Sequence, residues 1–203
     1  MNILVFDTCL DKMYVVLRTE DRILSSEIVE NTESKYHSAF LISTIAKVLN
    51  ENNIKPENLD VIGINIGPGS FTGIRACTTV ARVMAQQLNI KAIGISSLEI
   101  LSKVGGENPL VALDARKEKA YLYMDNEIKG AVEIEKIKEI INNGNYTVIT
   151  DNRLEKILGG TSYQQGDYKL GEILSDLVLN KIPEAEGNWA TLCPLYIQPP
   201  PMG

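Results

Sequence analysis

The stretch that decides the fold covers residues 61–92 and has three parts. It opens with Val61-Ile62-Gly63-Ile64-Asn65-Ile66, turns through Gly67-Pro68-Gly69-Ser70-Phe71-Thr72-Gly73, and continues as residues 74–88. The opening run is short, apolar and rich in β-branched residues, which predicts a buried strand. The last part repeats apolar residues every three or four positions, which predicts a helix. A strand, a glycine-rich turn and a helix in this order indicate an α/β protein.

The glycine-rich turn has two interpretations. Ser70 or Thr72 can cap the helix, and the unpaired N–H groups at a helix start favour an anion such as phosphate. The turn matches neither common nucleotide-binding motif. Thr72 stands where Gly-x-Gly-x-x-Gly requires its third glycine, and no Lys follows for a Walker A loop. From the spacing alone, phosphate binding and a structural strand-to-helix turn both remain open.

The composition predicts a cytoplasmic protein with a sizeable core. The chain has 203 residues, of which 44% are hydrophobic, and a formal net charge of −6. That charge argues against autonomous nucleic-acid binding, which needs clustered Lys and Arg. The amino terminus lacks the basic segment of a signal peptide, and no apolar run reaches the roughly 18 residues of a membrane span. We therefore expect a soluble, cytoplasmic protein that does not associate with a membrane.

Metal binding is not expected from the sequence. Cys9, Cys77 and Cys193 are scattered and odd in number, which is typical of reduced, mostly buried thiols. His37 is the single histidine, so a zinc site built by this chain alone is short of ligands. A catalytic triad would also have to use His37, which we interpret as a capping or interface residue at a helix start. We expect no catalytic residue, no metal and no cofactor on the isolated chain.

The strands and helices are expected in an order that is typical of one large fold class. Three strands with short, hairpin-like links come first, and helix, strand, helix and strand follow. These elements cover residues 3–7, 13–18, 22–29, 37–50, 61–66, 74–88 and 92–95. This is the layout of the ribonuclease H-like fold and of the actin-like ATPase and sugar-kinase fold.

The second half of the chain repeats these ingredients more loosely. The expected strands are 110–114, 120–124 and 147–150, and the expected helices are 132–141 and 167–179. A cluster of helix and strand breakers at residues 105–109 predicts a boundary. It divides the chain into an amino-terminal lobe of residues 1–104 and a smaller, degenerate lobe of residues 105–203. Four prolines from Pro194 onward predict an extended tail.

The residues that would hold a nucleotide in this fold class are only partly present. Asp7 ends the first strand, where actin-like kinases place a phosphate-site aspartate. A turn-initiating Asp that bonds the hairpin backbone explains Asp7 as well. The turn Cys9-Leu10-Asp11-Lys12 has no glycine, Asp114-Ala115-Arg116 lacks an Asp-x-Gly-Gly pattern, and Gly159-Gly160 also suits a helix C-cap. The residues predicted for a nucleotide or phosphate loop are Asp7, Thr8, Gly67, Gly69, Ser70, Gly73 and Arg75.

Several literal strings resemble the TsaB family, whose members belong to the bacterial machinery that makes threonylcarbamoyladenosine in tRNA. The most specific string is Gly67-Pro68-Gly69-Ser70-Phe71-Thr72-Gly73-Ile74-Arg75. Asp7-Thr8, His37-Ser38 with Leu41, and Leu113-Asp114-Ala115-Arg116 agree with further family motifs. The resemblance covers most of the first 116 residues and returns at Pro194-Leu195-Tyr196-Ile197. Over residues 126–187 it holds only in outline.

The resemblance implies a pseudo-enzyme of the actin-like fold. Proteins of this family pair with a catalytic paralogue, the TsaD transferase, and the ATPase TsaE joins that pair. In the transferase, two metal-binding histidines follow the strand equivalent to residues 92–95, whereas this chain has Ser97-Leu98-Glu99-Ile100-Leu101. Leucine cannot ligate a metal, so the transferase's metal is not expected here. The implied partners are a TsaD-like transferase, a TsaE-like ATPase and, for the chain alone, a second copy. The resemblance further implies that the chain contacts tRNA only indirectly and that ATP or ADP binds only within the complex.

Two helices carry more apolar surface than one sheet face requires. The apolar arcs of residues 37–50 and 74–88 span roughly 180° and about 200°, whereas packing on a sheet needs only ~100°. The surplus predicts either a partner surface or two helices that simply cover each other. Phe40 stands among polar residues of the first helix and strengthens the first interpretation. The predicted partner interface comprises His37, Phe40, Leu41, Ala76, Thr79, Val80 and Val83.

Three classes of function therefore compete. The leading hypothesis is a non-catalytic scaffold or activator subunit for the transferase. A catalytic transferase or a glycopeptidase-like hydrolase of the same fold would need the missing histidines. A stand-alone nucleotide-binding regulator or small-molecule kinase would need intact phosphate loops. The affinity of the isolated protein for ATP, and the proteins it captures from its own cell extract, distinguish the three.

Overall fold

The computed structural model describes residues 1–31 and 36–198. The chain forms two compact units: the first comprises Met1–Ser97 and Lys169–Leu195, and the second comprises Leu98–Tyr168 with the described residues 196–198. The expected division between residues 104 and 105 is therefore corrected, because the chain returns to the first unit after the second is built. The helix over Leu170–Lys181 packs on strands of the first unit and belongs with them.

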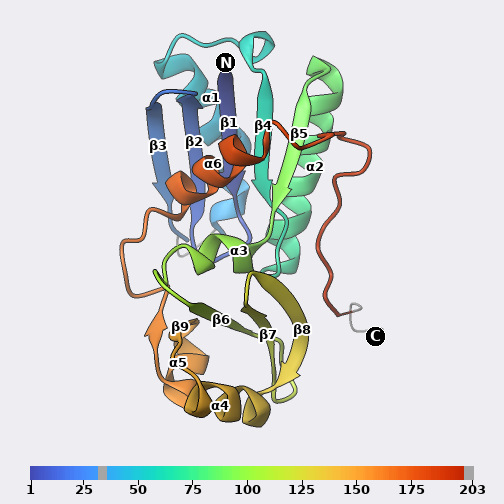
Figure 1. Cartoon of the computed structure of the whole chain (residues 1–203). Coiled ribbons are helices and arrows are strands. Elements are labelled where there is room, and N and C mark those ends of the chain that lie inside the picture. The colour runs from blue at the N-terminus through green and yellow to red at the C-terminus, as the bar shows by residue number, and fades with distance from the viewer. Residues whose placement is uncertain (32–35, 199–203) are drawn as a thin grey trace. The chain divides into compact units, whose positions relative to one another are not determined.

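The first unit is built on a five-stranded mixed sheet with the order β3-β2-β1-β4-β5 (Figure 1). Its strands are β1 (Asn2–Asp7), β2 (Met13–Thr19), β3 (Ile23–Val29), β4 (Val61–Asn65) and β5 (Lys91–Ile95). The first three are antiparallel, as two short hairpins dictate, while β4 pairs in parallel with both β1 and β5. The sequence-based strand order along the chain is confirmed.

Helices cover both faces of this sheet. On one face, α1 (Leu41–Glu51) and α2 (Phe71–Leu88) share a core cluster with Leu4 and Phe6 of β1, to which Ile45, Cys77 and Ala81 contribute. Two short 3₁₀ turns, η1 (His37–Phe40) and η2 (Pro56–Asn58), flank α1. On the other face lies α6 (Leu170–Lys181) (Figure 1). This alternation of contacts along β1 follows from the two-residue period of a strand.

Helix α6 approaches its sheet face closely because two glycines leave room for it. A Cβ added at Gly63 of β4 would lie 2.8 Å from Val178 Cγ1, and one at Gly171 would lie 2.8 Å from Tyr14 Cβ. The buried guanidinium of Arg18 on β2 reinforces the contact. It donates to Ser175 Oγ at 3.1 Å, pairs with Asp176, and donates to the carbonyl of Thr19 at 3.0 Å. Arg18 therefore links the sheet to α6, the last helix in the sequence.

We expect Arg18→Met to lower the free energy of unfolding by about 1–2 kcal/mol, since it removes charge-assisted hydrogen bonds but keeps most of the apolar stem. Thermal unfolding followed by circular dichroism measures this. Asp176→Asn is the matched control: the Asp176 side chain is 64% exposed, so losing its charge should cost only about 0–1 kcal/mol. Equal losses for both variants would contradict a role of Arg18 beyond the ion pair.

The second unit repeats the topology of the first on a smaller scale. Its sheet has the order β10-β9-β6-β7-β8, with the same alternation of antiparallel and parallel pairs. The strands are β6 (Pro109–Asp114), β7 (Lys119–Met124), β8 (Glu127–Glu133), β9 (Thr147–Thr150) and β10 (Thr161–Ser162). The accompanying helices are α3 (Ser97–Ser102), α4 (Ile134–Asn143) and α5 (Asn152–Leu158). The expected lobe of similar but reduced design is thus present.

Some element boundaries differ from expectation. The helix expected at residues 132–141 begins at Ile134, because residues 127–133 form the edge strand β8, which the sequence did not predict. Helix α5 and the two-residue strand β10 were also missed. The expected helix at 37–50 opens with the 3₁₀ turn η1 before α1 begins. Among the described residues up to Gln198, the proline-rich tail contains neither helix nor strand after Lys181.

Within residues 1–31 and 36–198, the structure contains no helix that is long and apolar enough to cross a membrane.

Candidate functional site

The turn from β4 into α2 is held by local hydrogen bonds. Ser70 is the N-cap of α2, and its Oγ accepts a hydrogen bond from the Gly73 N–H at 3.2 Å. The Ser70 carbonyl accepts from the Ile74 N–H at 2.8 Å. Of the two capping residues proposed from the sequence, Ser70 is the one used. Gly67 has φ +97°, a conformation that residues with a side chain rarely adopt.

The same turn packs directly against the backbone of the β1–β2 turn. The Ser70 N–H donates to the Cys9 carbonyl at 2.7 Å, and the Thr8 Oγ1–H donates to the Gly73 carbonyl at 2.7 Å. A Cβ at Gly73 would lie 2.7 Å from the Thr8 carbonyl carbon and nearer still to its oxygen. One at Gly69 would overlap the carbonyl of Cys9. Close approach between two segments of this chain therefore explains both glycines without a ligand.

Asp7 initiates the β1–β2 turn, as the structural interpretation of this residue required. Its Oδ1 accepts a hydrogen bond from the Cys9 N–H at 2.6 Å, and its Oδ2 accepts one from Asn65 Nδ2 at 3.0 Å. Asp7 is 1% exposed. Asp7, Thr8, Gly67, Gly69, Ser70 and Gly73 thus lie in one cluster of contacts, whereas Arg75 is exposed and stacks over the Phe71 ring at 5.1 Å from its centroid.

Asn65 is the centre of this cluster, and sequence reasoning did not identify it. The residue is fully buried at the end of β4. Its Oδ1 accepts hydrogen bonds from the Gly67 N–H at 2.8 Å and from Ser97 Oγ at 2.9 Å, while its Nδ2 donates to Asp7. A buried polar group is stable only when its hydrogen bonds are satisfied. The signal that could have found it is a single amide at the end of an otherwise apolar strand.

Two of the three cysteines meet in this cluster. Cys9 and Cys77 are buried and Cys193 is exposed, and all three are free thiols. Cys9 Sγ donates to the Asn65 carbonyl at 3.1 Å, and Cys77 Sγ accepts from the Thr8 N–H at 3.2 Å. Burial above all, and then the hydrogen bond to Cys77 and the charge of Asp7, raise the pKa of the Cys9 thiol well above its ordinary value. The expectation that the thiols are mostly buried is confirmed. Cys9 and Cys77, which are far apart in the sequence, lie together in the fold.

The second unit places Asp114 where the first places Asp7, at the end of its first strand. The Asp114 Oδ1 accepts from the Arg116 N–H at 2.8 Å and pairs with Arg153 of α5. Arg116, Lys117 and Glu118 all have positive φ values, 62°, 49° and 55°. Gly159, with φ +73°, is the C-cap residue of α5. The C-cap interpretation of the glycine pair is therefore confirmed.

The predicted partner interface is only partly on the surface. Leu41 is 2% exposed and belongs to the core, and Phe40 and Val80 are partly buried against it. The prediction that Phe40 lies on the polar side of the helix was wrong. The turn η1 is a 3₁₀ helix with three residues per turn, which rotates Phe40 towards the core. The backbone of His37 lies in η1, but its side chain is outside the described part of the structure.

Two residues of the predicted interface, Thr79 and Val83, belong to an exposed ridge on α2. It consists of Phe71, Arg75, Thr79 and Val83, which recur at four-residue spacing and are all exposed. Residues four apart are neighbours on one helix face. Val83 is 54% and Phe71 48% exposed, and Ile42 on α1 is 70% exposed. Ala76, also predicted, is partly buried.

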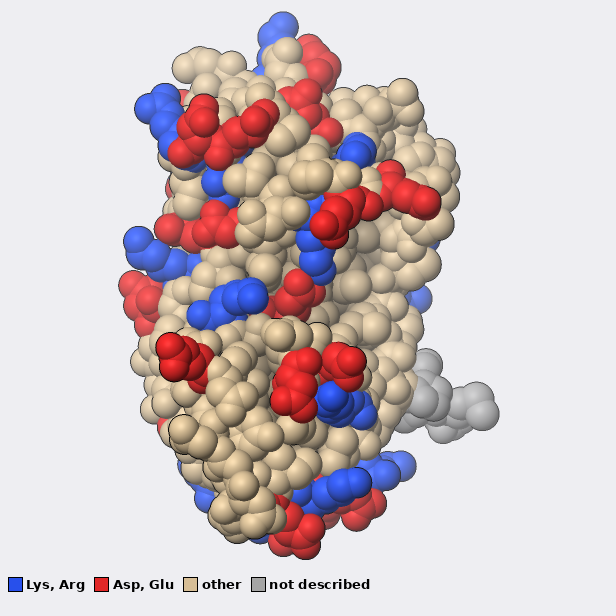
Figure 2. Space-filling model, viewed as in Figure 1, with Lys and Arg blue, Asp and Glu red and all other residues tan. Residues whose placement is uncertain are grey.

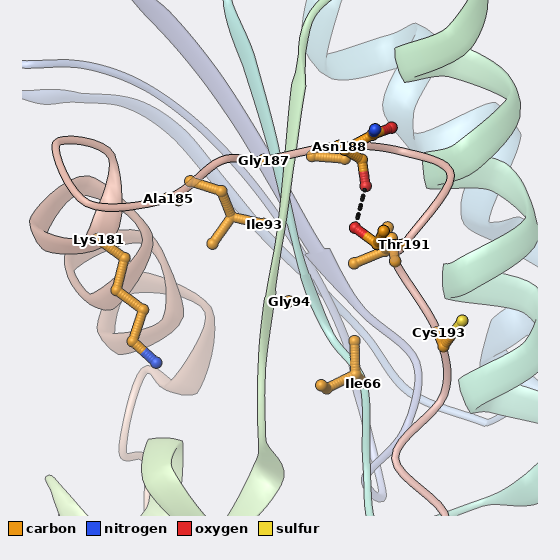
Figure 3. Close-up of a pocket in the computed structure, with 11 residues that line it drawn as sticks. Ile66, Ile93, Gly94, Lys181, Ala185, Gly187, Asn188, Thr191 and Cys193 are labelled. Atoms are coloured by element: carbon orange, nitrogen blue, oxygen red, sulfur yellow. Dashed lines mark hydrogen bonds between the residues drawn. The ribbon is translucent and has the colours of Figure 1, made fainter.

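A separate pocket of about 330 Å³ lies between β5 and the segment that follows α6 (Figure 3). Ile66, Ile93 and Leu192 give it an apolar lining. At its rim, Thr191 Oγ1 donates to the Asn188 carbonyl at 3.1 Å. None of the residues predicted for a site lines this pocket.

Fold and sequence together define the class of protein. The sheet order and the repeated unit are those of the actin-like, ribonuclease H-like fold. A family model described as tRNA N6-adenosine threonylcarbamoyltransferase (TsaD) matches residues 22–146, more than half of the chain. The chain resembles a Pseudomonas aeruginosa structure named YeaZ over 96% of its own length and 99% of that chain, with a TM-score of 0.76 at 21% identity. At that identity the likeness concerns the fold.

Similar proteins of known name show to which branch of this family the chain belongs. The TsaB protein of Bacillus subtilis, described as a tRNA threonylcarbamoyladenosine biosynthesis protein, is 32% identical over 124 residues, which are 60% of this chain and 53% of that protein. The TsaB protein of Buchnera aphidicola from Baizongia pistaciae is 26% identical over 163 residues, 77% of this chain and 70% of that protein. The match thus spans about half the length of the Bacillus relative. The chain belongs to the TsaD-like family that the model describes and, within it, to the TsaB proteins.

Proposed function

We propose that this chain is a non-catalytic subunit in the biosynthesis of threonylcarbamoyladenosine in tRNA, and that it acts by binding and activating a TsaD-like transferase. The relatives' names place those proteins in this biosynthesis and do not call them transferases. In the proposal, a TsaE-like ATPase joins the pair in the cytoplasm. The isolated chain binds no nucleotide or other organic cofactor and pairs with a second copy, and ATP or ADP is held only in the complex.

The observation that carries the proposal is that the apolar residues of α3 are buried. This helix follows β5, where the resemblance places the two metal-binding histidines of the transferase. Leu98, Ile100 and Leu101 are fully buried there, and Ser97 Oγ is committed to Asn65. Apolar side chains cannot ligate a metal, and Glu99 is the single carboxylate of this helix. These features support a scaffold and argue against the transferase or hydrolase alternative.

The residues predicted for a phosphate loop also argue against a stand-alone nucleotide-binding protein, because their hydrogen-bonding groups are used within the chain. The Ser70 and Gly73 N–H groups donate to protein atoms, and Asp7 accepts two hydrogen bonds from the protein. Direct capture of tRNA also lacks support: on the face in Figure 2, basic side chains of the described residues are interspersed with acidic ones and form no continuous patch. Phosphate binding by nucleic-acid partners needs such a patch.

The proposal predicts catalytic silence of the isolated chain. Purified alone, it should transfer no threonylcarbamoyl group to tRNA, because α3 lacks the pair of metal-binding histidines that the resemblance assigns to the transferase. Addition of the transferase and the ATPase should restore modification, measured by mass spectrometry of tRNA nucleosides. A reaction that lacks this chain but contains both partners is the control and should be slower. Turnover by the isolated chain, free of partner by mass spectrometry, would contradict the proposal.

A further inference from the structure

We propose that Asp7, Cys9 and Cys77 form a site for a thiophilic cation, with Zn²⁺ as the ion that fits it best. One carboxylate oxygen of Asp7 and the Sγ atoms of both cysteines all lie within 4.8 Å of one another. The three residues are 1%, 1% and 0% exposed. The inference is independent of the proposed function, because it rests only on this cluster.

The spacing of the three atoms fits one ion between them. Zinc binds thiolate sulfur at about 2.3 Å and carboxylate oxygen at about 2.0–2.2 Å, so ligand atoms around it lie roughly 3.3–3.8 Å apart. A contraction of about 1 Å from the upper limit of the observed spacing completes this geometry. Cys9 lies in the β1–β2 turn, outside the strands and helices, and the contraction therefore falls on the side-chain torsions of Cys9, Asp7 and Cys77. The Asn65 carbonyl, which accepts a hydrogen bond from Cys9 Sγ at 3.1 Å, borders the cluster.

Hydrogen bonds already orient two of the three ligands, Asp7 and Cys77. The two oxygens of Asp7 accept from the Cys9 N–H and from Asn65 Nδ2. Cys77 Sγ accepts from the Thr8 N–H. Donors of this kind fix the directions of the Asp7 and Cys77 ligand atoms, as outer-shell groups do around metals in proteins. A disulfide would join only the two cysteines, whereas a cation uses all three groups.

The charge balance also favours a divalent cation. Binding of one Zn²⁺ releases the two thiol protons, and two sulfur–zinc bonds replace two sulfur–hydrogen bonds. With Asp7 ionised, the buried cluster carries one negative charge before and after this exchange. No additional charge is therefore buried, which avoids the large cost of placing an unpaired ion in a protein interior. Thiolate ligands select zinc and other soft ions over magnesium or calcium.

The test uses Cd²⁺ as a spectroscopic probe of the same coordination chemistry, together with zinc itself. Because the site is buried, the full chain is refolded from metal-free denaturant with one equivalent of either ion and then desalted. In the desalted protein we expect about one ion retained per chain and an ultraviolet thiolate-to-cadmium band. In a separate thermal scan with free ion at a hundredfold excess over its dissociation constant, the melting temperature should rise by roughly 5–10 °C.

Cysteine variants locate the site. Cys9→Ser and Cys77→Ser should lose the band and weaken retention about 10-fold or more, while Cys193→Ser, the matched exposed control, should behave like the parent. Asp7→Asn should weaken binding yet keep the thiolate band, since both sulfurs remain. Circular dichroism verifies folding, and Cys77→Ala replaces Cys77→Ser if the serine variant does not fold. The proposal is overturned if the parent retains no ion, if Cys9→Ser and Cys77→Ser retain it equally well, or if the refolded parent contains a Cys9–Cys77 disulfide instead.

Discussion

Gly73→Ala should lower the free energy of unfolding by about 3 kcal/mol, which corresponds to a fall of about 6–12 °C in melting temperature. Gly73 lies in the first turn of α2, where helix propensity alone favours alanine over glycine by about 1 kcal/mol. The new Cβ would instead meet the Thr8 carbonyl, with 2.7 Å to its carbon. The two effects have opposite signs. The clash is the larger one, because the Thr8 carbonyl and the first turn of α2 are both backbone and cannot move aside as a flexible side chain could.

Thermal and urea unfolding of the variant measure this effect. Gly106→Ala is the control, because Gly106 has φ +64° and nothing lies within 4 Å of an added Cβ. That change introduces backbone strain alone and should cost about 1–2 kcal/mol. Gly69→Ala should resemble Gly73→Ala, since its Cβ would meet the Cys9 carbonyl. A stability gain for Gly73→Ala would show that the two turns separate readily and that the glycines serve another purpose.

Val83→Glu should weaken binding to the transferase by about 100-fold or more, and the isolated chain should become a monomer. Val83 is 54% exposed on the ridge that also carries Phe71, Arg75 and Thr79. In an interface at this ridge, the new carboxylate would be buried without a partner, which costs several kcal/mol. In the free protein it remains in water, so the melting temperature should change little.

Co-purification, isothermal titration and size-exclusion chromatography measure these effects. Ile157→Glu is the matched control, because Ile157 is an exposed apolar residue of the second unit. Ile42→Asp on α1 is a second variant at an exposed position and should act in the same direction. Phe40→Asp is unsuitable, since Phe40 packs against the core and its loss would destabilise the fold. Parental affinity in the Val83→Glu, Ile42→Asp double variant would place the partner surface elsewhere.

Local signals predicted the glycine-rich stretch well because they act within a few residues. The apolar run, the turn residues and the helical spacing over residues 61–88 correspond to β4, the capped turn and α2. The capping role of Ser70 and the turn-initiating role of Asp7 also follow from side chains that bond nearby backbone. Such features need no knowledge of the rest of the fold.

Other features depend on contacts between distant residues and could not be predicted in this way. Asn65 meets Asp7 because β1 and β4 pair in parallel, with Phe6 opposite Ile64. Cys9 and Cys77 also come together through the fold, because α2 packs on the sheet face that contains Leu4 and Phe6 of β1. The strand β8 was missed because it is an edge strand, and its polar residues weaken the alternating pattern. For Phe40, a single 3₁₀ turn altered the helical phase.

The return of the chain to its first unit has a consequence for synthesis on the ribosome. The second unit is continuous over Leu98–Tyr168, so its core can form as soon as those residues emerge. The first unit must wait for α6, which ends at Lys181. At about 5–20 residues per second, the interval between residues 97 and 181 lasts roughly 4–17 s. During that time the sheet face containing Val5 and Gly63 lacks its helix, and the nascent chain exposes an apolar surface that chaperones recognise.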